Sequence, residues 1–282
     1  MERLSTRLTE LLRIQHPILL APMDVVADGR LAAAVSRAGG FGIIGGGYGD
    51  ETWLAREMDA AGDARVGVGF ITWSMARRPK LLDMVLERRP PAVMLSFGDV
   101  RPHAHKIKSV GSLLICQVQT LEQAKDAVAN GADVLVAQGA EAGGHGISRA
   151  TFPFVPAVVD QAPDTPVAAA GGIADGRGLA AALMLGADGV LVGTRFYASQ
   201  EAAGVQSAKN RIVTGKGDRT IRSILFVLHV KTYGRPHIVV AYCRTIFPRN
   251  GAVVRLTCSS TKRKSRRDTR RRVPRGTSTR LL

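Results

Sequence analysis

Eight short apolar runs recur between residues 18 and 192, and this recurrence is the feature that most limits how the chain can fold. Each run is continuously apolar, which is expected of parallel strands buried on both faces. The runs are Ile18–Ala21, Phe41–Ile44, Val66–Ile71, Ala92–Leu95, Leu113–Cys116, Val134–Ala137, Val167–Ala170 and Val190–Val192. Their repeat of roughly 20–30 residues matches one strand plus one helix, so the pattern predicts eight successive βα units.

The segments between the runs show the spacing of amphipathic helices. Three such faces are Leu31, Ala34 and Val35, then Leu121, Ala124 and Val128, then Leu179, Ala182 and Leu183. Glycines stand where a left-handed C-terminal cap would end a helix, at Gly39, Gly131 and Gly186. Asp175 stands where an N-terminal cap would begin one. Eight units favour a closed α/β barrel of the (β/α)8 TIM type, with an open doubly wound sheet as the alternative if one run is misassigned.

The positive charge is concentrated at one end of the chain. The formal net charge is +16, but residues 1–226 hold 24 Lys and Arg against 22 Asp and Glu. Residues 227–282 hold 15 against 1, and the strand and helix pattern does not continue there. A segment so rich in Lys, Arg, Ser and Thr buries too little apolar area to fold alone. We therefore expect a barrel domain over 1–226 and an irregular, disordered basic tail over 227–282.

Cysteine content and the lack of long apolar segments favour a cytoplasmic protein. Cys116, Cys243 and Cys258 have neither the number nor the spacing of a disulfide framework or a metal site. No apolar run reaches the length of a membrane span, and residues 1–15 have no signal-peptide core. We expect a reducing compartment, no metal and no membrane, while the oligomeric state stays open.

The strongest candidate for chemistry is His145, which stands among glycines shortly after the sixth run. Barrels of this class carry their reactive side chains on loops at the carboxyl ends of the strands. An imidazole can take a proton from a carbon acid near neutral pH, and neighbouring glycines let a substrate approach closely. A lone histidine is more often structural, and that alternative remains. The other histidines of the barrel region, His16, His103 and His105, are expected outside the site.

Glycines that directly follow the last two apolar runs predict a phosphate site. Gly171 and Gly172 follow the seventh run, and Gly193 and Thr194 follow the eighth. Loops at these two positions commonly bind phosphate in such barrels, because glycine lets backbone N–H groups approach an oxyanion. Tight turns alone would also explain the glycines. Their placement on both expected loops favours a phosphorylated cofactor.

The ends of other runs supply candidates for contact with a flat heterocycle. Ala21-Pro22-Met23 ends the first run, and the soft Met23 side chain suits the face of an aromatic ring. Gln117 and Gln138 lie at the ends of the fifth and sixth runs, where their amides suit a polar ring edge. Core packing or barrel capping is the alternative for each. Trp73 and Asp99 are weaker candidates for the same pocket.

These residues together resemble the nitronate monooxygenase family, whose members are FMN-dependent TIM-barrel enzymes. The resemblance spans roughly residues 14–204, and the Glu-Ala-Gly-Gly-His string is its most specific part. The motifs are Gln15–Ile18 leading to Ala21–Met23, Gln138–Gly146, Ala170–Gly176 and Gly193–Phe196.

The resemblance implies an FMN across the barrel mouth and His145 as general base. The implied cofactor contacts are Ala21, Pro22, Met23, Gln117, Gln138, Gly143, Gly171, Gly172, Gly193 and Thr194. The implied reaction oxidises an alkyl nitronate or nitroalkane with O2 to a carbonyl compound and nitrite. The alternative enzyme is an NADH-dependent enoyl-acyl-carrier-protein reductase, because such reductases have a similar Gly-Gly-His loop.

The resemblance stops near Phe226. Gly217–Thr220 still resembles the family, whereas the later segment has the Arg-rich composition of a GC-rich coding region read in a shifted frame. We therefore hypothesise a frameshifted C-terminus, which a family-like sequence in another reading frame would support. The alternatives are an inactive truncated product and a genuine arm for nucleic acid or another anionic surface. Nucleic acid is the less favoured partner, because no aromatic residues are interleaved with the charges.

Overall fold

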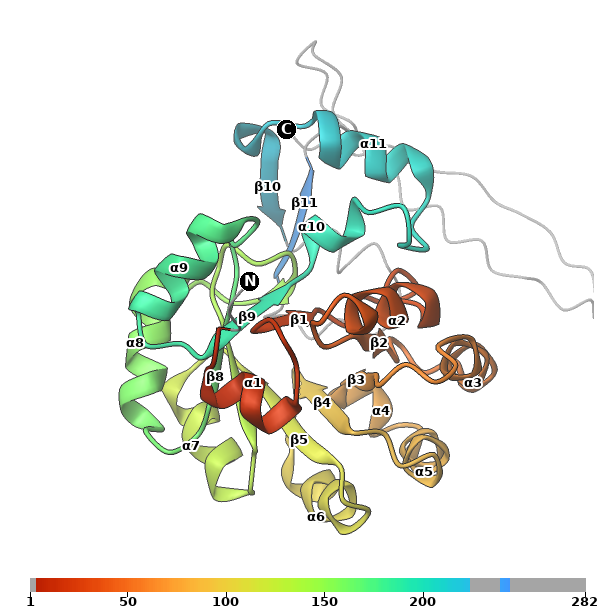
Figure 1. Ribbon diagram of the computed structural model, residues 1–282. Coiled ribbons are helices and arrows are strands. Elements are labelled where there is room, and N and C mark those ends of the chain that lie inside the picture. Colours follow the sequence, from red (N-terminus) through yellow and green to blue (C-terminus); the bar gives the residue numbers. More distant parts are fainter. Residues whose placement is uncertain (1–3, 224–238, 244–282) are drawn as a thin grey trace, which may run out of the picture. The chain divides into compact units, whose positions relative to one another are not determined.

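The computed structural model describes residues 4–223 and 239–243, which belong to one compact unit, Met1–Ile246. Eight parallel strands form a sheet of order β1-β9-β8-β6-β5-β4-β3-β2 (Figure 1). They are β1 Ile18–Leu20, β2 Ile43–Gly45, β3 Gly67–Ile71, β4 Ala92–Ser96, β5 Leu113–Val118, β6 Val134–Gln138, β8 Val167–Ala170 and β9 Gly189–Val192. Bonds of 2.9 Å from Leu20 N to Phe41 O and from Phe41 N to Ile18 O join β1 to the chain before β2. The sheet therefore closes into a TIM barrel, and the fold predicted from the apolar runs is confirmed.

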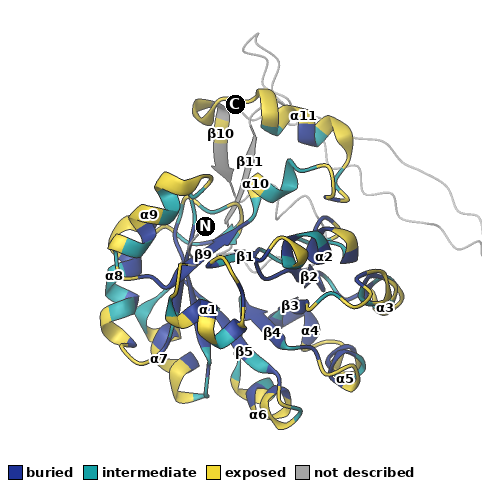
Figure 2. Ribbon diagram, in the orientation of Figure 1, coloured by how far each residue is buried: buried dark blue, intermediate teal, exposed yellow. Residues whose placement is uncertain are grey.

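Alternate residues of each strand enter two different cores, which explains the continuous apolarity of the runs. In β4, Met94 belongs to the cluster inside the barrel with Phe41 and Ile115, whereas Val93 and Leu95 belong to the cluster between sheet and helices. Figure 2 shows buried strands surrounded by helices that expose their outer sides. Both strand faces are dry, as parallel sheets require.

Helices connect the strands around the outside of the barrel. They are α2 Gly29–Arg37, α3 Glu51–Ala60, α4 Thr72–Met75, α5 Pro79–Glu87, α6 Arg101–Ser109, α7 Leu121–Ala129, α8 Thr151–Gln161 and α9 Gly176–Met184, followed by α10 Thr194–Tyr197, α11 Gln206–Thr214 and the 3-10 turn Gly217–Arg219. The predicted caps Gly39, Gly131 and Gly186 all have left-handed φ, between 78° and 90°. Asp175 accepts bonds from the amides of Arg177 and Gly178, as an N-cap does. The predicted face of α7 is wrong at Val128, which is 39% exposed, because Ala127 is buried instead.

Helix α1, Arg7–Leu12, closes the end of the barrel at which the strands begin. Its Leu8 and Leu12 side chains are fully buried in the interior cluster. Arg7 anchors the helix, because its Nε and Nη2 donate bonds of 2.8 Å to the carboxylate of Asp188, just before β9. The interior is therefore packed from below, and space for a ligand is left to the opposite end.

A second, antiparallel sheet pairs β7, Gly144–Gly146, with β11, Val239–Cys243, which also pairs with β10, Thr220–Ser223. Two expectations were wrong here. The stretch around His145 is a short strand rather than a loop, and residues 239–243 form a strand where no regular structure was expected. The rest of the predicted tail, including Cys258, lies outside the described residues, so its disorder and the frameshift stay predictions. No helix in the described part of the chain is long and apolar enough to span a membrane.

Candidate active site

The two predicted phosphate loops lie next to each other, because β8 and β9 are paired strands. Gly171 and Gly172 have φ of 121° and 72°, values that glycine adopts without strain. A Cβ on Gly171 would lie 2.6 Å from Thr151 Oγ1 and 2.9 Å from Ala142 N. The loop after β8 therefore requires glycine, both for its backbone conformation and for its close approach to neighbouring segments.

The amides of these loops suit an anion. Within residues 4–223 and 239–243, the amides of Gly172, Gly193 and Thr194 have no hydrogen-bond acceptor. A Cβ on Gly176, the first residue of α9, would meet no atom within 4 Å, so there is open space beside this residue, while the next two amides of the helix are capped by Asp175. Backbone donors beside a helix N-terminus are a recurring phosphate site. The residues present thus fit the phosphate of FMN.

A carboxylate near this site is already balanced by a cation. Asp175 accepts a 2.6 Å bond from Arg177 Nη2, and this bond lowers the pKa of the carboxyl to about 2. Glu141 is engaged elsewhere, because its Oε2 accepts 2.8 Å bonds from both the amide and the hydroxyl of Thr151 at the start of α8. Both carboxylates near the glycine loops therefore already have hydrogen-bond donors.

The loop after β1 lies against the loop after β9, as the flavin hypothesis requires. Ala21 N donates a 2.9 Å bond to Val192 O. A Cβ on Gly193 would lie 3.4 Å from Ala21 Cβ and 3.6 Å from Met23 Sδ. Pro22 packs on the backbone at Gly69, where a Cβ would lie 2.4 Å from Pro22 Cβ. Likewise, a Cβ on Gly143 would lie 3.6 Å from Thr194 Oγ1.

His145 stands in an aromatic enclosure at the mouth of the barrel. Its Nε2 lies 3.1 Å from the hydroxyl of Tyr48. The Phe97 ring lies edge-on at 5.4 Å between centroids, and the Trp73 ring lies at 6.4 Å. These rings come from the segments after β2, β3 and β4, so three successive strand ends surround the imidazole.

Enclosure keeps the His145 imidazole neutral, because burial disfavours its charged form and lowers its pKa. Its Nδ1 is buried and has no hydrogen-bond partner in the described part of the chain. A buried N–H without an acceptor is more costly than a buried lone pair. We therefore assign the proton to Nε2, which donates to Tyr48, and the lone pair to Nδ1. An uncharged imidazole with a lone pair that no other group uses is equipped to accept a proton.

The two predicted glutamines contact each other beside the His145 strand. Gln117 Nε2 donates a 2.9 Å bond to Gln138 Oε1, and Gln138 Nε2 donates a 2.9 Å bond to the backbone carbonyl of His145. Gln119, a residue that the sequence did not single out, donates a 2.7 Å bond to the same Gln138 oxygen. Both Gln119 and Gln138 are nearly inaccessible, with 5% and 6% of their surface exposed.

The sequence analysis also missed Tyr48 and Phe97. Tyr48 carried a usable signal, because it belongs to the glycine-rich string Gly45–Gly49 directly after the second apolar run. This loop is held by the Asp24 carboxyl, which accepts a bond from the Tyr48 amide and whose pKa is raised by burial. Phe97 carried no signal, since its position depends on a left-handed φ of 62°.

The remaining candidates from the sequence differ in their surroundings. Asp99, a weaker candidate for the pocket, has an exposed carboxylate that pairs with Arg101 at 2.8 Å. Trp73 does face His145. His16 and His105 are exposed, whereas His103 is half-buried. No group of three or more possible metal ligands occurs among the described residues.

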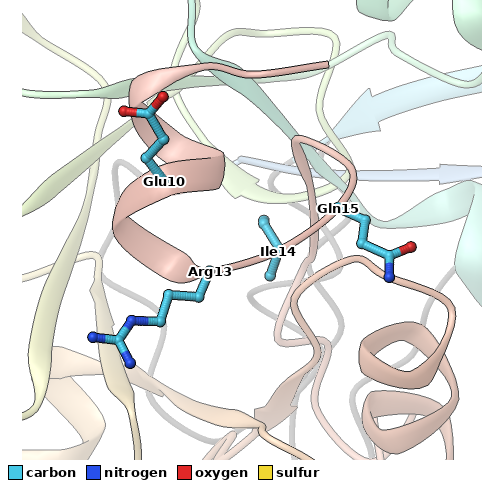
Figure 3. A pocket seen from close by; sticks show the side chains of 4 residues that line it. All are labelled: Glu10, Arg13, Ile14 and Gln15. Carbon is cyan, nitrogen blue, oxygen red and sulfur yellow. The ribbon is translucent and has the colours of Figure 1, made fainter. Parts of the chain in front are cut away.

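A shallow cavity of about 340 Å³ lies beside α1, at the opposite end of the barrel (Figure 3). It is lined by Glu10, Arg13, Ile14 and Gln15. The strands begin at this end, and barrels of this class carry their chemistry where the strands finish. The candidate active site is therefore the group of residues around His145 and not this cavity.

Comparison with known proteins decides the family. The family model described as nitronate monooxygenase matches residues 5–66 and 67–227. The chain belongs to the nitronate monooxygenase family. Nitronate monooxygenases are FMN-dependent oxidoreductases, so the predicted enzyme class and cofactor are confirmed.

Several members and neighbours of the nitronate monooxygenase family are similar to this chain. The nitronate monooxygenase of Pseudomonas aeruginosa is 34% identical, with 79% of this chain and 77% of that protein covered. A (3aS,4S,5R,7aS)-5-hydroxy-7a-methyl-1-oxo-octahydro-1H-indene-4-carboxyl-CoA dehydrogenase from Rhodococcus jostii is 35% identical, with 85% of this chain covered. The chain spans 67% of the length of that dehydrogenase. The structure of FabK from Thermotoga maritima is 34% identical with a TM-score of 0.78, covering 86% of this chain and 76% of FabK.

Proposed function

We propose that this chain catalyses the FMN-dependent oxidation of alkyl nitronates and nitroalkanes by O2 to carbonyl compounds and nitrite. The observation that carries the proposal is the neutral His145 imidazole, enclosed by Tyr48, Trp73 and Phe97 at the barrel mouth. Similarity to the Pseudomonas aeruginosa nitronate monooxygenase supports the same reaction class.

The chain's own residues would act on the proton of a neutral nitroalkane. His145 Nδ1 accepts the proton from the carbon beside the nitro group, which leaves the nitronate anion and an imidazolium. Tyr48 accepts the Nε2–H bond throughout and so holds the ring in one orientation. The aromatic side chains exclude water, which keeps the base unprotonated before the substrate arrives.

The cofactor would lie across the same mouth. FMN, when bound, supplies the electron-transfer chemistry and the reaction with O2. The amides of Gly172, Gly193 and Thr194 would hold its phosphate, helped by the open space beside Gly176, while Gly143 and Gly171 would let the neighbouring backbone segments approach. The loop Ala21–Met23 and the amide of Gln117 would lie against its ring, as the sequence predicts. Gln138 would contact the same ring through its remaining N–H.

A second candidate is an oxidoreductase that acts on an acyl thioester. The Rhodococcus jostii relative is named as the dehydrogenase of a carboxyl-CoA compound, which is such a thioester. The Gly-Gly-His pattern at Gly143–His145 also supports this alternative, since enoyl-acyl-carrier-protein reductases have a similar loop. A cytoplasmic location also stays a prediction, supported by the free, buried Cys116.

Anaerobic mixing separates the two candidates. The yellow, FMN-loaded protein should lose its flavin absorbance with ethyl nitronate and not with NADH. Bleaching by NADH alone would favour the thioester reductase and overturn the proposal. A colourless protein that FMN cannot reconstitute would overturn both readings and favour an inactive product.

The role of His145 is tested by His145→Ala. Nitroethane turnover should fall about 100-fold or more, because general-base catalysis contributes that much or more. FMN content should be unchanged, since His145 is not assigned to cofactor binding. Unchanged nitroethane turnover would refute the general-base assignment.

A further inference from the structure

A directed chain of hydrogen bonds runs across three neighbouring strand ends and finishes at the His145 backbone. The Ser96 hydroxyl, at the end of β4, is 3.5 Å from Gln117 Oε1 on β5. Gln117 Nε2 donates to Gln138 Oε1 on β6, and Gln138 Nε2 donates to the His145 carbonyl. Each amide thus accepts at its oxygen and donates at its nitrogen toward the next group.

The orientation of the Gln138 amide is fixed by its neighbours. Its Oε1 receives two donors, from Gln117 at 2.9 Å and from Gln119 at 2.7 Å. An amide turned by 180° would set its own N–H groups against both of those donors. It would also set its oxygen against the His145 carbonyl, which is 2.9 Å from the Gln138 amide. The two donors therefore force Gln138 to present its N–H side to His145.

Gln119 is itself held by the start of α7. Its backbone N donates a 2.7 Å bond to Gln123 Oε1, one turn into the helix. Thr120 caps the helix, because its hydroxyl accepts a 3.1 Å bond from the Gln123 amide. The side chain of Gln119 is 5% exposed, so its donor is fixed in place by both burial and backbone anchoring.

We propose that Gln119 is a positioning residue for His145. Through Gln138, it holds the backbone of β7 so that the imidazole stays between Tyr48, Trp73 and Phe97. The effect of Gln119 on turnover rests on the proposed function. The effect of Gln119 on the position of the His145 imidazole does not. Removing the donor should loosen the strand and let the ring reach water.

The test uses Gln119→Met in the full-length, FMN-loaded protein. Methionine keeps the length and volume of glutamine but has no N–H to donate. Gln161→Met is the matched control, because Gln161 is exposed at the last position of α8. Nitroethane kinetics and an NMR titration of the His145 ring are measured, with the ring signal identified by its loss in His145→Gln.

In Gln119→Met, kcat should fall about 5- to 10-fold, the effect of one lost hydrogen bond, while KM and FMN content stay within about twofold. The pKa of His145 should rise toward the ordinary histidine value of about 6.5, because burial is what lowers it. Gln161→Met should change neither quantity. A purely structural Gln119 would lower the melting temperature without moving the His145 titration.

An unchanged His145 titration together with unchanged kcat overturns the proposal. If Gln119→Met does not fold, Gln123→Met decides, since it replaces an exposed helical side chain and releases the Gln119 backbone. That variant should shift the His145 titration in the same direction by a smaller amount, and no shift would also overturn the proposal. If the unmodified protein leaves nitronates untouched while the titration shifts, the proposed function fails and the positioning role stands.

Discussion

Replacing Tyr48 with Phe isolates the hydrogen bond that orients the proposed base. The change removes one oxygen, 3.1 Å from His145 Nε2, and keeps the ring that lies 5.9 Å from Trp73. The enclosure of the imidazole is therefore preserved. What is lost is the acceptor for the Nε2 proton.

The expected magnitude follows from that missing acceptor. A buried N–H without a partner costs about 1–3 kcal/mol, which is about 5- to 150-fold in population. In Tyr48→Phe neither ring nitrogen has a partner, so the Nε2–H tautomer loses this advantage and the imidazole loses the bond that holds it in one orientation. We expect kcat/KM for a neutral nitroalkane to fall at least about tenfold.

The assay compares nitroethane with preformed ethyl nitronate. The nitronate needs no deprotonation, so its kcat/KM in Tyr48→Phe should stay within about twofold of the unmodified protein. Flavin content and melting temperature serve as controls for folding. Equal losses for both substrates would show that Tyr48 acts on binding or stability, and the assignment of Tyr48 as the group that orients the base would then be wrong.

Three further predictions concern pH, glycine geometry and a buried carboxylate. Because burial lowers the pKa of His145, kcat/KM for nitroethane should stay constant with falling pH until below about 6.5 and then drop, and a break above that value in a pH profile would contradict the base assignment. Gly171→Ala should lower the melting temperature and weaken FMN retention in equilibrium dialysis, since its φ is 121° and its Cβ would lie 2.6 Å from Thr151 Oγ1. Asp188→Ala should lower the free energy of unfolding in urea by about 2–3 kcal/mol, because it leaves the buried Val167 amide, now bonded at 2.9 Å, without an acceptor. An undiminished urea midpoint would contradict that reasoning.

The barrel was predictable because its signals are local. A strand buried on both faces must be apolar at every position, so the eight runs marked the eight strands within a few residues. Gly131 and Gly186 ended helices because a left-handed residue is needed there. His145 and the glycines after the last two strands could be proposed as site residues for the same reason, since they stand in the segments that follow such runs.

The rest of the site depends on contacts between segments far apart in the sequence. Tyr48 and His145 are 97 positions apart and meet only because β2 and β6 both end at the barrel mouth. Gln119 looks in the sequence like an ordinary polar residue before a helix. Its proposed role becomes visible only in the structure, where its side chain donates to Gln138 and thereby fixes the orientation of the Gln138 amide. The strand at 239–243 was missed because it stands apart from the repeating strand and helix pattern and pairs with a segment far earlier in the sequence, Gly144–Gly146, only in the folded chain.

The buried side chains Leu8 and Leu12, which close one end of the barrel, separate the residues that stabilise the fold from those of the candidate site along the barrel axis. Cohesion is concentrated where the strands start, and reactivity where they finish. Trimming either leucine should make the enzyme easier to melt while leaving each surviving folded molecule as competent as before. Substitutions can therefore change the candidate active site and the melting temperature of this protein almost independently.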